Sequence, residues 1–380
     1  MKVAVYRYGE EGLDQFIDPD HVDETKCQLL LGFGSKNMLL NQSVFDSLKK
    51  KFPDSIIALS STAGEIFMEH VTENTLSVTA IQFENTIVKS EVVNVSSFKS
   101  SFEAGAGLIK KLPLKDLKHI FILSDGALVN GSQLINGMNS ITKNEIPITG
   151  GLAGDSANFQ STLVGLDKMP ENGNIIAIGF YGNSIVINYG SNGGWIGFGL
   201  EKKITKSSAN ELYEIDRINA LELYKNYLGK YAKSLPASAL LFPLSIKVKE
   251  EDEPIVRTIL SINEERRSMI FAGDVPEGAK VRFMKANLDN LAEAAGTATK
   301  KLIERAGNNK PKLVVLISCV GRKLIFGKRI EEEISAVNDM LSEHTLITGF
   351  YSYGEISPSN RNACCELHNQ TMTITSFDER

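Results

Sequence analysis

The chain reads VVLISCVGR at residues 314–322, an apolar run that ends in a glycine-bearing turn. A short continuous apolar run of this kind predicts a strand that is buried on both faces, and the glycine allows the backbone to turn sharply after it. Two other segments have the same character, LLLGFGS at residues 29–35 and IFILSDG at residues 120–126. Each of the three is followed by a helical pattern and by a second apolar strand, so the sequence predicts a repeated unit.

The later part of each copy is also alike: the second strand ends in a glycine followed by an acid, and a polar loop leads to a closing strand. The distance from the first turn to this acid is 31 positions from Gly34 to Glu65, 30 from Asp125 to Asp155 and 36 from Cys319 to Glu355. Capping residues before 3.6-period apolar patterns predict helices led by Asn41, Ser132 and Asn219. The predicted unit is therefore β-α-β-β.

A weaker copy is expected within residues 240–286, where LLFPLSI, FAGDVPEG and AKVRFMKA follow one another. Strands and helices that alternate in this way are typical of layered α/β proteins. The predicted fold class is α/β, with mixed sheets flanked by helices and with pseudo-repeated β-α-β-β units in two halves. A ligand crevice is expected at strand ends, in the C-terminal half or where the halves meet.

The turns that carry a glycine and an acid occur four times, at Gly64 and Glu65, Gly154 and Asp155, Gly273 and Asp274, and Gly354 and Glu355. A carboxylate beside such a turn accepts hydrogen bonds from exposed N–H groups or from a ligand amine. Four copies favour a shared architectural role, with one or two retained as ligand contacts, among them Asp155 and Glu355.

The composition excludes several classes of protein. The 380 residues are 42% hydrophobic and 23% charged, and 41 Lys and Arg against 46 Asp and Glu give a net charge of -5. No basic patch is dense enough for nucleic acid, and no apolar run is long enough to enter a membrane. Four cysteines without metal or redox spacing do not indicate disulfides. These features predict a cytoplasmic protein.

Several motifs keep their order and spacing in the C-terminal part: SCVGRKLIFGKRIEEE at residues 318–333, GFYSYGEISP at 349–358 and CELHNQTMTI at 365–374. Together with GGWIGFG at 193–199 and FAGDVPEGAKVRFM at 271–284, they resemble the FIST sensory proteins. The resemblance divides the chain into a FIST N-terminal-like domain at residues 27–218 and a FIST C-terminal-like domain at residues 219–377.

This resemblance implies a bacterial signal-transduction module that binds a small ligand, with amino acids as the usual suggestion. It also implies partners such as histidine kinases or cyclic-di-nucleotide signalling proteins. We expect no catalysis, and we expect the signal to pass by contact with a separate protein. A similar subgroup binds haem and senses nitric oxide, and haem would need an axial ligand such as one of the five histidines, His21, His70, His119, His344 and His368.

The sharpest site hypothesis is an amino-acid clamp made by Arg322 and Glu355. The Gly321 turn places the planar guanidinium of Arg322 at the end of a buried strand, where it would bind a carboxylate. Glu355 would bind an ammonium group from the opposite strand end, and strand alternation would point Tyr351 and Tyr353 to one face. The alternative is that Arg322 pairs with Glu331 or Glu332.

Four further residues are candidates for the ligand site. Cys319 precedes the Gly321 turn, where a helix start and a cation would lower its pKa, so a thiol-dependent enzyme is a second alternative to sensing. Trp195 lies in the glycine-rich stretch GSNGGWIGFG and either covers a ligand or anchors two domains. His368 and Asn369 are expected to form a polar edge of the pocket. The spacing of Cys364, Cys365 and His368 is poor for zinc, and no metal is expected.

Overall fold

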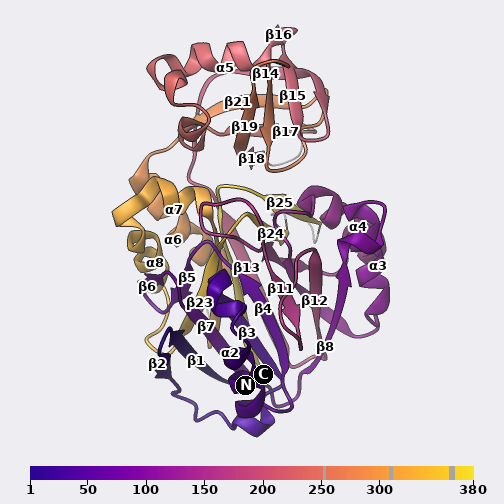
Figure 1. Cartoon of the computed structure of the whole chain (residues 1–380), viewed down its shortest axis with the longest axis vertical. Helices are drawn as coiled ribbons and strands as arrows, with labels where there is room; N and C mark the ends of the chain where they lie inside the picture. Colours follow the sequence, from indigo (N-terminus) through magenta and orange to yellow (C-terminus); the bar gives the residue numbers. More distant parts are fainter. Residues whose placement is uncertain (251–253, 308–310, 359–363) are drawn as a thin grey trace.

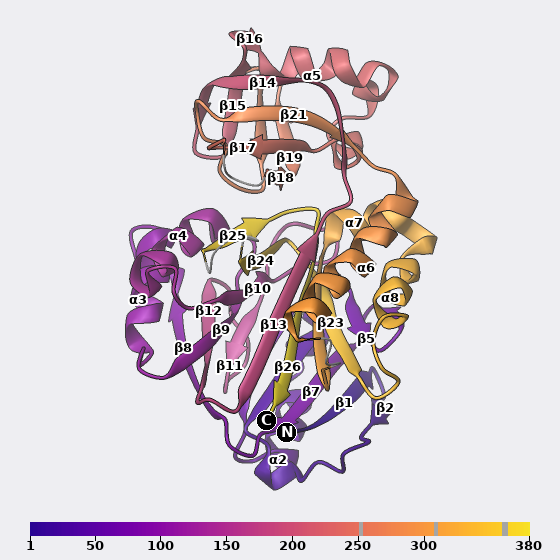
Figure 2. The same ribbon diagram turned by 180° about the vertical axis from the view of Figure 1, so that it is seen from behind.

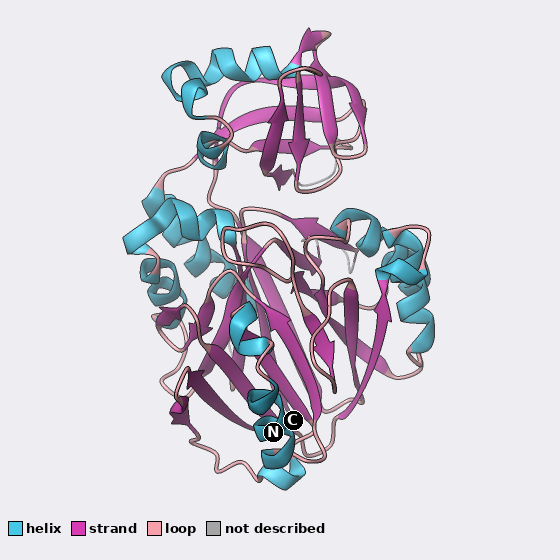
Figure 3. Cartoon of the chain, in the orientation of Figure 1, coloured by secondary structure: helices cyan, strands magenta, loops and turns pink. Residues whose placement is uncertain are grey.

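The computed structural model describes residues 1–250, 254–307, 311–358 and 364–380. The chain forms a large body, residues 1–195 and 286–380, and a small domain, residues 196–285, which lies on the end of the body opposite the two chain termini (Figure 1). Three mixed sheets build the body, and helices cover their outer faces (Figure 3). The predicted α/β class with mixed sheets flanked by helices is confirmed.

The three sheets of the body each contain six strands in the described part of the chain. The first has the order β11 (Val164–Leu166), β4 (Ile56–Ser61), β3 (Leu29–Gly34), β7 (Leu76–Gln82), β1 (Lys2–Gly9) and β2 (Gly12–Ile17). The second has the order β25 (Cys365–His368), β24 (Gly354–Pro358), β10 (Ile148–Leu152), β9 (Leu117–Ser124), β12 (Asn174–Tyr181) and β8 (Ile87–Asn94). The third has the order β13 (Ile185–Asn192), β26 (Met372–Glu379), β22 (Leu313–Cys319), β23 (Leu346–Ser352), β5 (Glu65–Phe67) and β6 (His70–Thr72).

The helices of the body lie on the outside of these sheets. The N-terminal ones are α1 (Lys36–Leu39), α2 (Gln42–Lys51), α3 (Ser101–Lys111) and α4 (Gly131–Thr142). The C-terminal ones are α6 (Leu288–Arg305), α7 (Val320–Phe326) and α8 (Glu331–Asn338). Figure 2 shows α6 and α8 beside the third sheet and α3 and α4 beside the second. None of the helices in the described residues has the length and apolar composition needed to cross a membrane.

Each predicted β-α-β-β unit forms the same local sheet. The first strand pairs parallel with the second and antiparallel with the closing strand: β3 with β4 and β7, β9 with β10 and β12, and β22 with β23 and β26. A parallel pair needs a crossover, and here α2, α4 and the α7–α8 segment provide it. The three full copies predicted from the sequence are thus confirmed.

The units are interlocked by the strands that follow the second strand of each copy. β5 of the first copy pairs with β23 of the third, β24 of the third pairs with β10 of the second, and β11 of the second pairs with β4 of the first. Strands from both sides of the expected boundary at residues 218 and 219 therefore share sheets. That boundary itself falls in the small domain, at the start of α5 (Ala220–Leu228).

The small domain corrects the expected weaker copy. Its strands are β14 (Ile196–Ser208), β15 (Glu211–Ile215), β16 (Ile218–Asn219), β17 (Leu244–Lys247), β18 (Ile255–Arg257), β19 (Ile259–Asn263), β20 (Ser268–Phe271) and β21 (Lys280–Lys285). β17 pairs antiparallel with both β18 and β21, and β20 pairs antiparallel with β15 and β19. Residues 240–286 contain no parallel pair among those described, so their apolar runs belong to an antiparallel sheet.

The main core lies where the three sheets of the body meet. Aromatic side chains from all three units are fully buried there, and the rings of Phe33 and Phe350 lie 4.8 Å apart. Phe121 of the second unit contacts Phe377 of the third at a ring separation of 6.1 Å. Because each unit contributes to one common core, the carboxyl ends of the strands are held in a fixed relation to one another.

Candidate functional site

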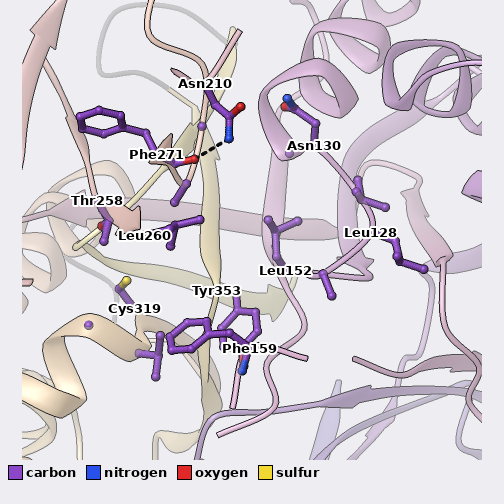
Figure 4. Close-up of a pocket in the computed structure, with 18 of the residues that line it drawn as sticks. Leu128, Asn130, Leu152, Phe159, Asn210, Thr258, Leu260, Phe271, Cys319 and Tyr353 are labelled. Atoms are coloured by element: carbon purple, nitrogen blue, oxygen red, sulfur yellow. Dashed lines mark hydrogen bonds between the residues drawn. The ribbon is translucent and has the colours of Figure 1, made fainter. Parts of the chain in front are cut away.

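A cavity of about 330 Å³ lies between the small domain and the body (Figure 4). The body contributes the turn after β9, residues 126–131, and the junction between β22 and α7, residues 319–321. The small domain contributes residues around Thr258, Leu260 and Phe271. The cavity thus lies at the carboxyl ends of two equivalent strands, where ligands of α/β sheets collect. It agrees with the crevice expected at strand ends.

The turn after β9 is fixed by a buried carboxylate. Asp125 is fully buried, and its Oδ1 accepts hydrogen bonds from the N–H groups of Ala127 and Leu128 at 2.8 and 2.6 Å. Its Oδ2 accepts one from the N–H of Gly173 at 2.9 Å. The carboxylate therefore joins the wall of the cavity to the start of the closing strand β12. Both of its oxygens accept hydrogen bonds from backbone N–H groups of the body.

Asn130 lines the cavity and also joins the two domains. Its Oδ1 accepts a hydrogen bond from the N–H of Gln133 at 3.0 Å, so it is the N-cap of α4. Its Nδ2 donates to Oδ1 of Asp274 in the small domain at 3.1 Å. The N–H of Asp274 donates in turn to Oγ of Ser132 at 3.3 Å. An acid is thus placed at the positive end of α4, where its charge is stabilised.

Arg257 makes the second contact between the domains. It is buried, its Nε donates to the backbone oxygen of Asp274 at 3.1 Å, and its Nη1 donates to the backbone oxygen of Leu367 at 2.8 Å. Burial lowers the pKa of its guanidinium to about 10. We call Asn130, Asp274 and Arg257 the interdomain latch, because these contacts hold the small domain over the cavity.

The junction between β22 and α7 brings Cys319 and Gly321 into the lining of the cavity. Burial raises the pKa of the Cys319 thiol well above its ordinary value, and the nearby carboxylate of Glu355 raises it further. The expectation of a lowered pKa is therefore wrong, because desolvation outweighs the helix start and the Arg322 charge. A Cβ added to Gly321 would lie 2.5 Å from the amide of Gln370, so a larger residue would displace that side chain.

Two stacked aromatic rings form another part of the lining. The rings of Tyr353 and Phe159 lie 4.7 Å apart with an interplanar angle of 20°. The Tyr353 hydroxyl accepts from the N–H of Phe159 at 3.0 Å and donates to the backbone oxygen of Ser156 at 3.3 Å. Burial raises the pKa of Tyr353 to about 12, so the ring stays neutral. Tyr351 does not share this face.

The expected clamp is corrected first at Arg322. This residue is fully buried and is absent from the lining of the cavity. Its Nε and Nη2 donate to Oε2 of Glu333 at 2.9 and 2.8 Å, and its Nη1 and Nη2 donate to the backbone oxygens of Gly193 and Leu291, both at 2.8 Å. Its charge is paired with Glu333, not with Glu331 or Glu332, and it has a structural role.

The residues around Glu333 complete this buried network. Tyr351 is fully buried, and its hydroxyl donates to Oε1 of Glu333 at 2.8 Å. Ser318 donates to the same oxygen at 3.0 Å. Burial raises the pKa of Tyr351 well above its ordinary value. Tyr351 therefore fixes the ion pair and is not a ligand contact, contrary to expectation.

Glu355, the other half of the expected clamp, is also fully buried. It accepts hydrogen bonds from Oγ of Ser352 at 2.9 Å and from the N–H and Oγ1 of Thr371 at 3.1 and 2.8 Å. Burial raises its pKa to about 8. Its partners are all within the body, so Glu355 and Arg322 do not form a clamp across the cavity.

Glu65 repeats the arrangement of Glu355 in the first unit. Its carboxylate binds the hydroxyl of Thr62, three residues earlier, and the N–H and hydroxyl of Thr75, which precedes the closing strand β7. Burial raises its pKa to about 7. The expected shared architectural role of these acids is confirmed for Glu65 and Glu355, which each join a turn to the start of a closing strand.

The remaining candidates lie outside the main cavity. Trp195 and His368 line a second cavity of about 250 Å³ near the connection between the domains. The Trp195 indole donates to the backbone oxygen of Gln370 at 2.8 Å, and Nε2 of His368 lies 3.2 Å from the backbone oxygen of Ser357. Asn369 is fully buried, and neither atom of its amide has a hydrogen-bond partner in the described residues.

Asp155 lies near the start of the loop that carries Phe159. Its carboxylate accepts from the N–H of Ser161 at 3.3 Å and lies 3.8 Å from Nζ of Lys36. It therefore fixes this loop from outside the cavity, and a direct role in ligand binding stays a prediction.

The residues of the cavity do not fit a haem. Its lining among the described residues contains no histidine, and the two possible axial ligands are Cys319 and Tyr353. The Cys319 thiol is held neutral by burial, and the Tyr353 hydroxyl is already bonded on both sides. His119 is buried elsewhere, where desolvation lowers its pKa to about 3 and its Nε2 lies 2.8 Å from Oγ1 of Thr149. No metal-binding group of three His, Cys, Asp or Glu occurs in the part of the chain that is described.

Sequence reasoning found Cys319, Gly321 and Tyr353 of this cavity and missed the residues that close it. Asn130 was missed because the helix pattern placed the start of α4 at Ser132, whereas the helix begins at Gly131. Asp274 was visible as an acid beside a glycine, but it faces the N-terminus of a distant helix. Arg257 carries no local signal of this role.

Comparisons with known proteins give two family matches. The model of the FIST N domain matches residues 28–218, and the model of the FIST C domain matches residues 220–358. No curated protein matched the chain. Among solved structures, the cyanuric acid hydrolase of A. caulinodans is 8% identical with a TM-score of 0.39, over 100% of this chain and 99% of that one. A second cyanuric acid hydrolase is 9% identical with a TM-score of 0.38, over 99% of each chain.

Proposed function

The chain belongs to the FIST family, whose domains are sensory domains of signal transduction, and on that premise we propose that it binds a small ligand in the interdomain cavity. The observation that carries the proposal is that the cavity is closed by a separate domain. The turns after β9 and β22 form one wall, and the small domain forms the other. A ligand in the cavity would therefore contact the small domain and could change its position relative to the body.

The interdomain latch provides the link between binding and signal. Asn130 lines the cavity and at the same time binds Asp274, so a ligand that contacts Asn130 competes with or reinforces this contact. A ligand that prefers one arrangement of the domains shifts the population toward that arrangement. The small domain would then present a different surface to a separate partner protein. Histidine kinases and cyclic-di-nucleotide signalling proteins of the bacterial cytoplasm are the partner classes that we propose.

We propose binding without turnover. The thiol of Cys319 is the strongest nucleophile in the lining, and nucleophilic catalysis would require its thiolate. Burial keeps the thiol neutral, and the described lining residues include no histidine or carboxylate that could take its proton. This chemistry favours a sensor over the thiol-dependent enzyme.

The test is a thermal-shift screen of small metabolites, including the twenty amino acids, on the wild type and two variants. Leu260→Arg places a bulky cation in the cavity, because Leu260 is a lining residue. Leu200→Arg is the matched control, because Leu200 is also in the small domain and is 81% exposed without lining the cavity. Ligands of the proposed site stabilise the wild type and Leu200→Arg but not Leu260→Arg. Equal stabilisation of all three would place the binding site elsewhere.

A further inference from the structure

The chemical class of the ligand follows from the charge of the cavity. Every described side chain in its lining is uncharged, since the lining consists of Gly, Ala, Val, Leu, Phe, Tyr, Thr, Asn and Cys residues. The ionised groups just behind the lining are already engaged: Asp125 binds three backbone N–H groups, Asp274 binds Asn130, and Arg257 binds backbone oxygens. None of these three residues is part of the lining.

A charged ligand in this cavity would exchange part of its hydration for uncharged neighbours, because no side chain of the described lining offers it an opposite charge. Loss of hydration is unfavourable for an ion unless an opposite charge compensates it, and the penalty grows with the extent of burial. An amino acid carries two such charges, and it would need one partner for each. The amino acid expected from the sequence is therefore disfavoured at this site.

The apolar part of the lining includes two aromatic rings. The stacked rings of Phe159 and Tyr353 present an aromatic surface, and aromatic rings pack well on one another in an offset or edge arrangement. Leu128, Phe159 and Leu260 are 61%, 47% and 47% exposed, although all three line the cavity. They come from three separate segments, and a ring compound between them would cover apolar surface that is otherwise in water.

The polar part of the lining consists of two amides, one from each domain. Asn130 and Asn210 lie across the upper part of the cavity from each other (Figure 4). Asn130 donates to Asp274, and Asn210 donates through Nδ2 to the backbone oxygen of Phe271 at 2.8 Å. A carboxamide has two N–H donors and an oxygen with two lone pairs, so each side chain retains hydrogen-bonding capacity beyond these contacts. Amides of this kind bind neutral groups that both donate and accept.

We infer that the cavity binds an uncharged planar ring compound with amide-like polar groups. The inference rests on the proposed function, which makes the cavity the ligand site. The ring lies against Phe159 and Tyr353, and its polar edge faces Asn130 and Asn210.

The experiment compares benzamide with three related probes. Benzamide has the ring and a neutral amide; benzoate has the same ring with a negative charge; L-phenylalanine carries the ring on a zwitterionic amino acid in place of the amide; and cyclohexanecarboxamide keeps the amide without a planar ring. Isothermal titration measures each Kd. We expect benzamide to bind at least tenfold more tightly than benzoate and L-phenylalanine, and at least threefold more tightly than cyclohexanecarboxamide.

Two variants separate this inference from the proposed function. In Leu260→Arg benzamide binds at least tenfold more weakly, because the arginine occupies part of the cavity, and in Leu200→Arg its affinity is unchanged. If benzoate or L-phenylalanine binds more tightly to the wild type, or if none of the four probes binds, the ligand class is wrong. The proposed site still stands in that case, provided that another metabolite loses its binding in Leu260→Arg. If probes bind equally to all three proteins, the proposed site itself fails.

Discussion

Nδ2 of Asn130, in the body, donates a hydrogen bond of 3.1 Å to Oδ1 of Asp274, in the small domain. Asn130 is the N-cap of α4, the helix that follows the buried strand β9, and Asp274 follows Gly273 in the small domain. Their contact holds the two walls of the cavity together. The first prediction concerns this contact.

Asp274→Ala loosens the small domain. The substitution removes the hydrogen bond from Asn130 and the negative charge at the N-terminus of α4, and a hydrogen bond to a charged group contributes roughly 1.5–3 kcal/mol. We expect amide hydrogen exchange in residues 271–275 to become about tenfold faster, which corresponds to about 1.4 kcal/mol. The measurement is exchange detected by mass spectrometry.

Glu277→Ala is the matched control for Asp274→Ala, because Glu277 is an exposed acid in the same loop. Its exchange rates in residues 271–275 are expected to equal those of the wild type. An unchanged rate in Asp274→Ala would show that the latch does not hold the domains.

Arg322→Met destabilises the whole chain. The substitution leaves the carboxylate of Glu333 buried without its partner, and loss of one member of a buried ion pair costs about 3–5 kcal/mol. The backbone oxygens of Gly193 and Leu291 also lose their donors. Urea unfolding is expected to show a much lower midpoint.

Arg329→Met is the control for Arg322→Met. Arg329 pairs with Glu332 and Asp289 at the surface, where ion pairs contribute little, so its midpoint is expected to change only slightly. A stable Arg322→Met variant that fails only in ligand binding would restore the clamp that the sequence suggested.

The repeats could be predicted because their signals are local. An apolar run of strand length, a glycine turn and a 3.6-period pattern occur together in each unit, and each unit folds as expected. The pairing of β5, β11 and β24 with strands of other units could not be predicted. The turn at Gly64 or Gly354 shows only that the chain leaves its strand, and it does not show which sheet edge the chain joins next. The strands of the small domain were misread for a similar reason, since an apolar run does not reveal whether its neighbour is parallel.

The sequence predicted where in the fold the candidate site lies, but it identified only some of the residues that line it. Cys319, Gly321 and Tyr353 line the cavity because strand ends place them there. Arg322 follows Gly321 directly, yet it faces Glu333 of α8 instead of the cavity. Residue type predicts that an arginine binds an anion, but only the orientation of a short helix decides whether that anion is a ligand or a neighbouring glutamate. Contacts between domains, such as that of Arg257 with Leu367, leave no local pattern.

Glu355→Gln flattens the dependence of stability on pH. Burial raises the pKa of Glu355 from an ordinary 4.5 to about 8, so the folded chain holds a proton that the unfolded chain releases. The resulting stability is fully present below about pH 4.5 and is lost as the pH rises through about 8. Glutamine resembles the protonated acid and does not ionise. The unfolding free energy of the wild type, measured by urea titration from pH 6.5 to 9, should fall more than that of the variant.

Glu65→Gln acts in the same direction, because burial raises the pKa of Glu65 to about 7, and the double variant should show the flattest profile of all. Glu145→Gln, at an exposed position, should follow the wild type. Parallel curves for wild type and Glu355→Gln would mean that Glu355 is ionised in the fold.

Cys319 reacts slowly in the folded chain. Alkylation requires the thiolate, and burial raises the pKa of Cys319 well above its ordinary value while only 4% of the residue is exposed. We expect iodoacetamide at pH 8 to modify Cys319 at least a hundredfold more slowly in the native chain than in 6 M guanidinium, as followed by peptide mass spectrometry. Cys364, which is half-buried, provides an internal comparison in the same sample.

Benzamide at saturating concentration should slow the labelling of Cys319 further, because the Cys319 thiol lines the cavity that benzamide occupies. The labelling of Cys364 should be unaffected. Rapid native labelling of Cys319 would instead indicate an accessible thiolate, and it would favour the thiol-dependent enzyme over the sensor.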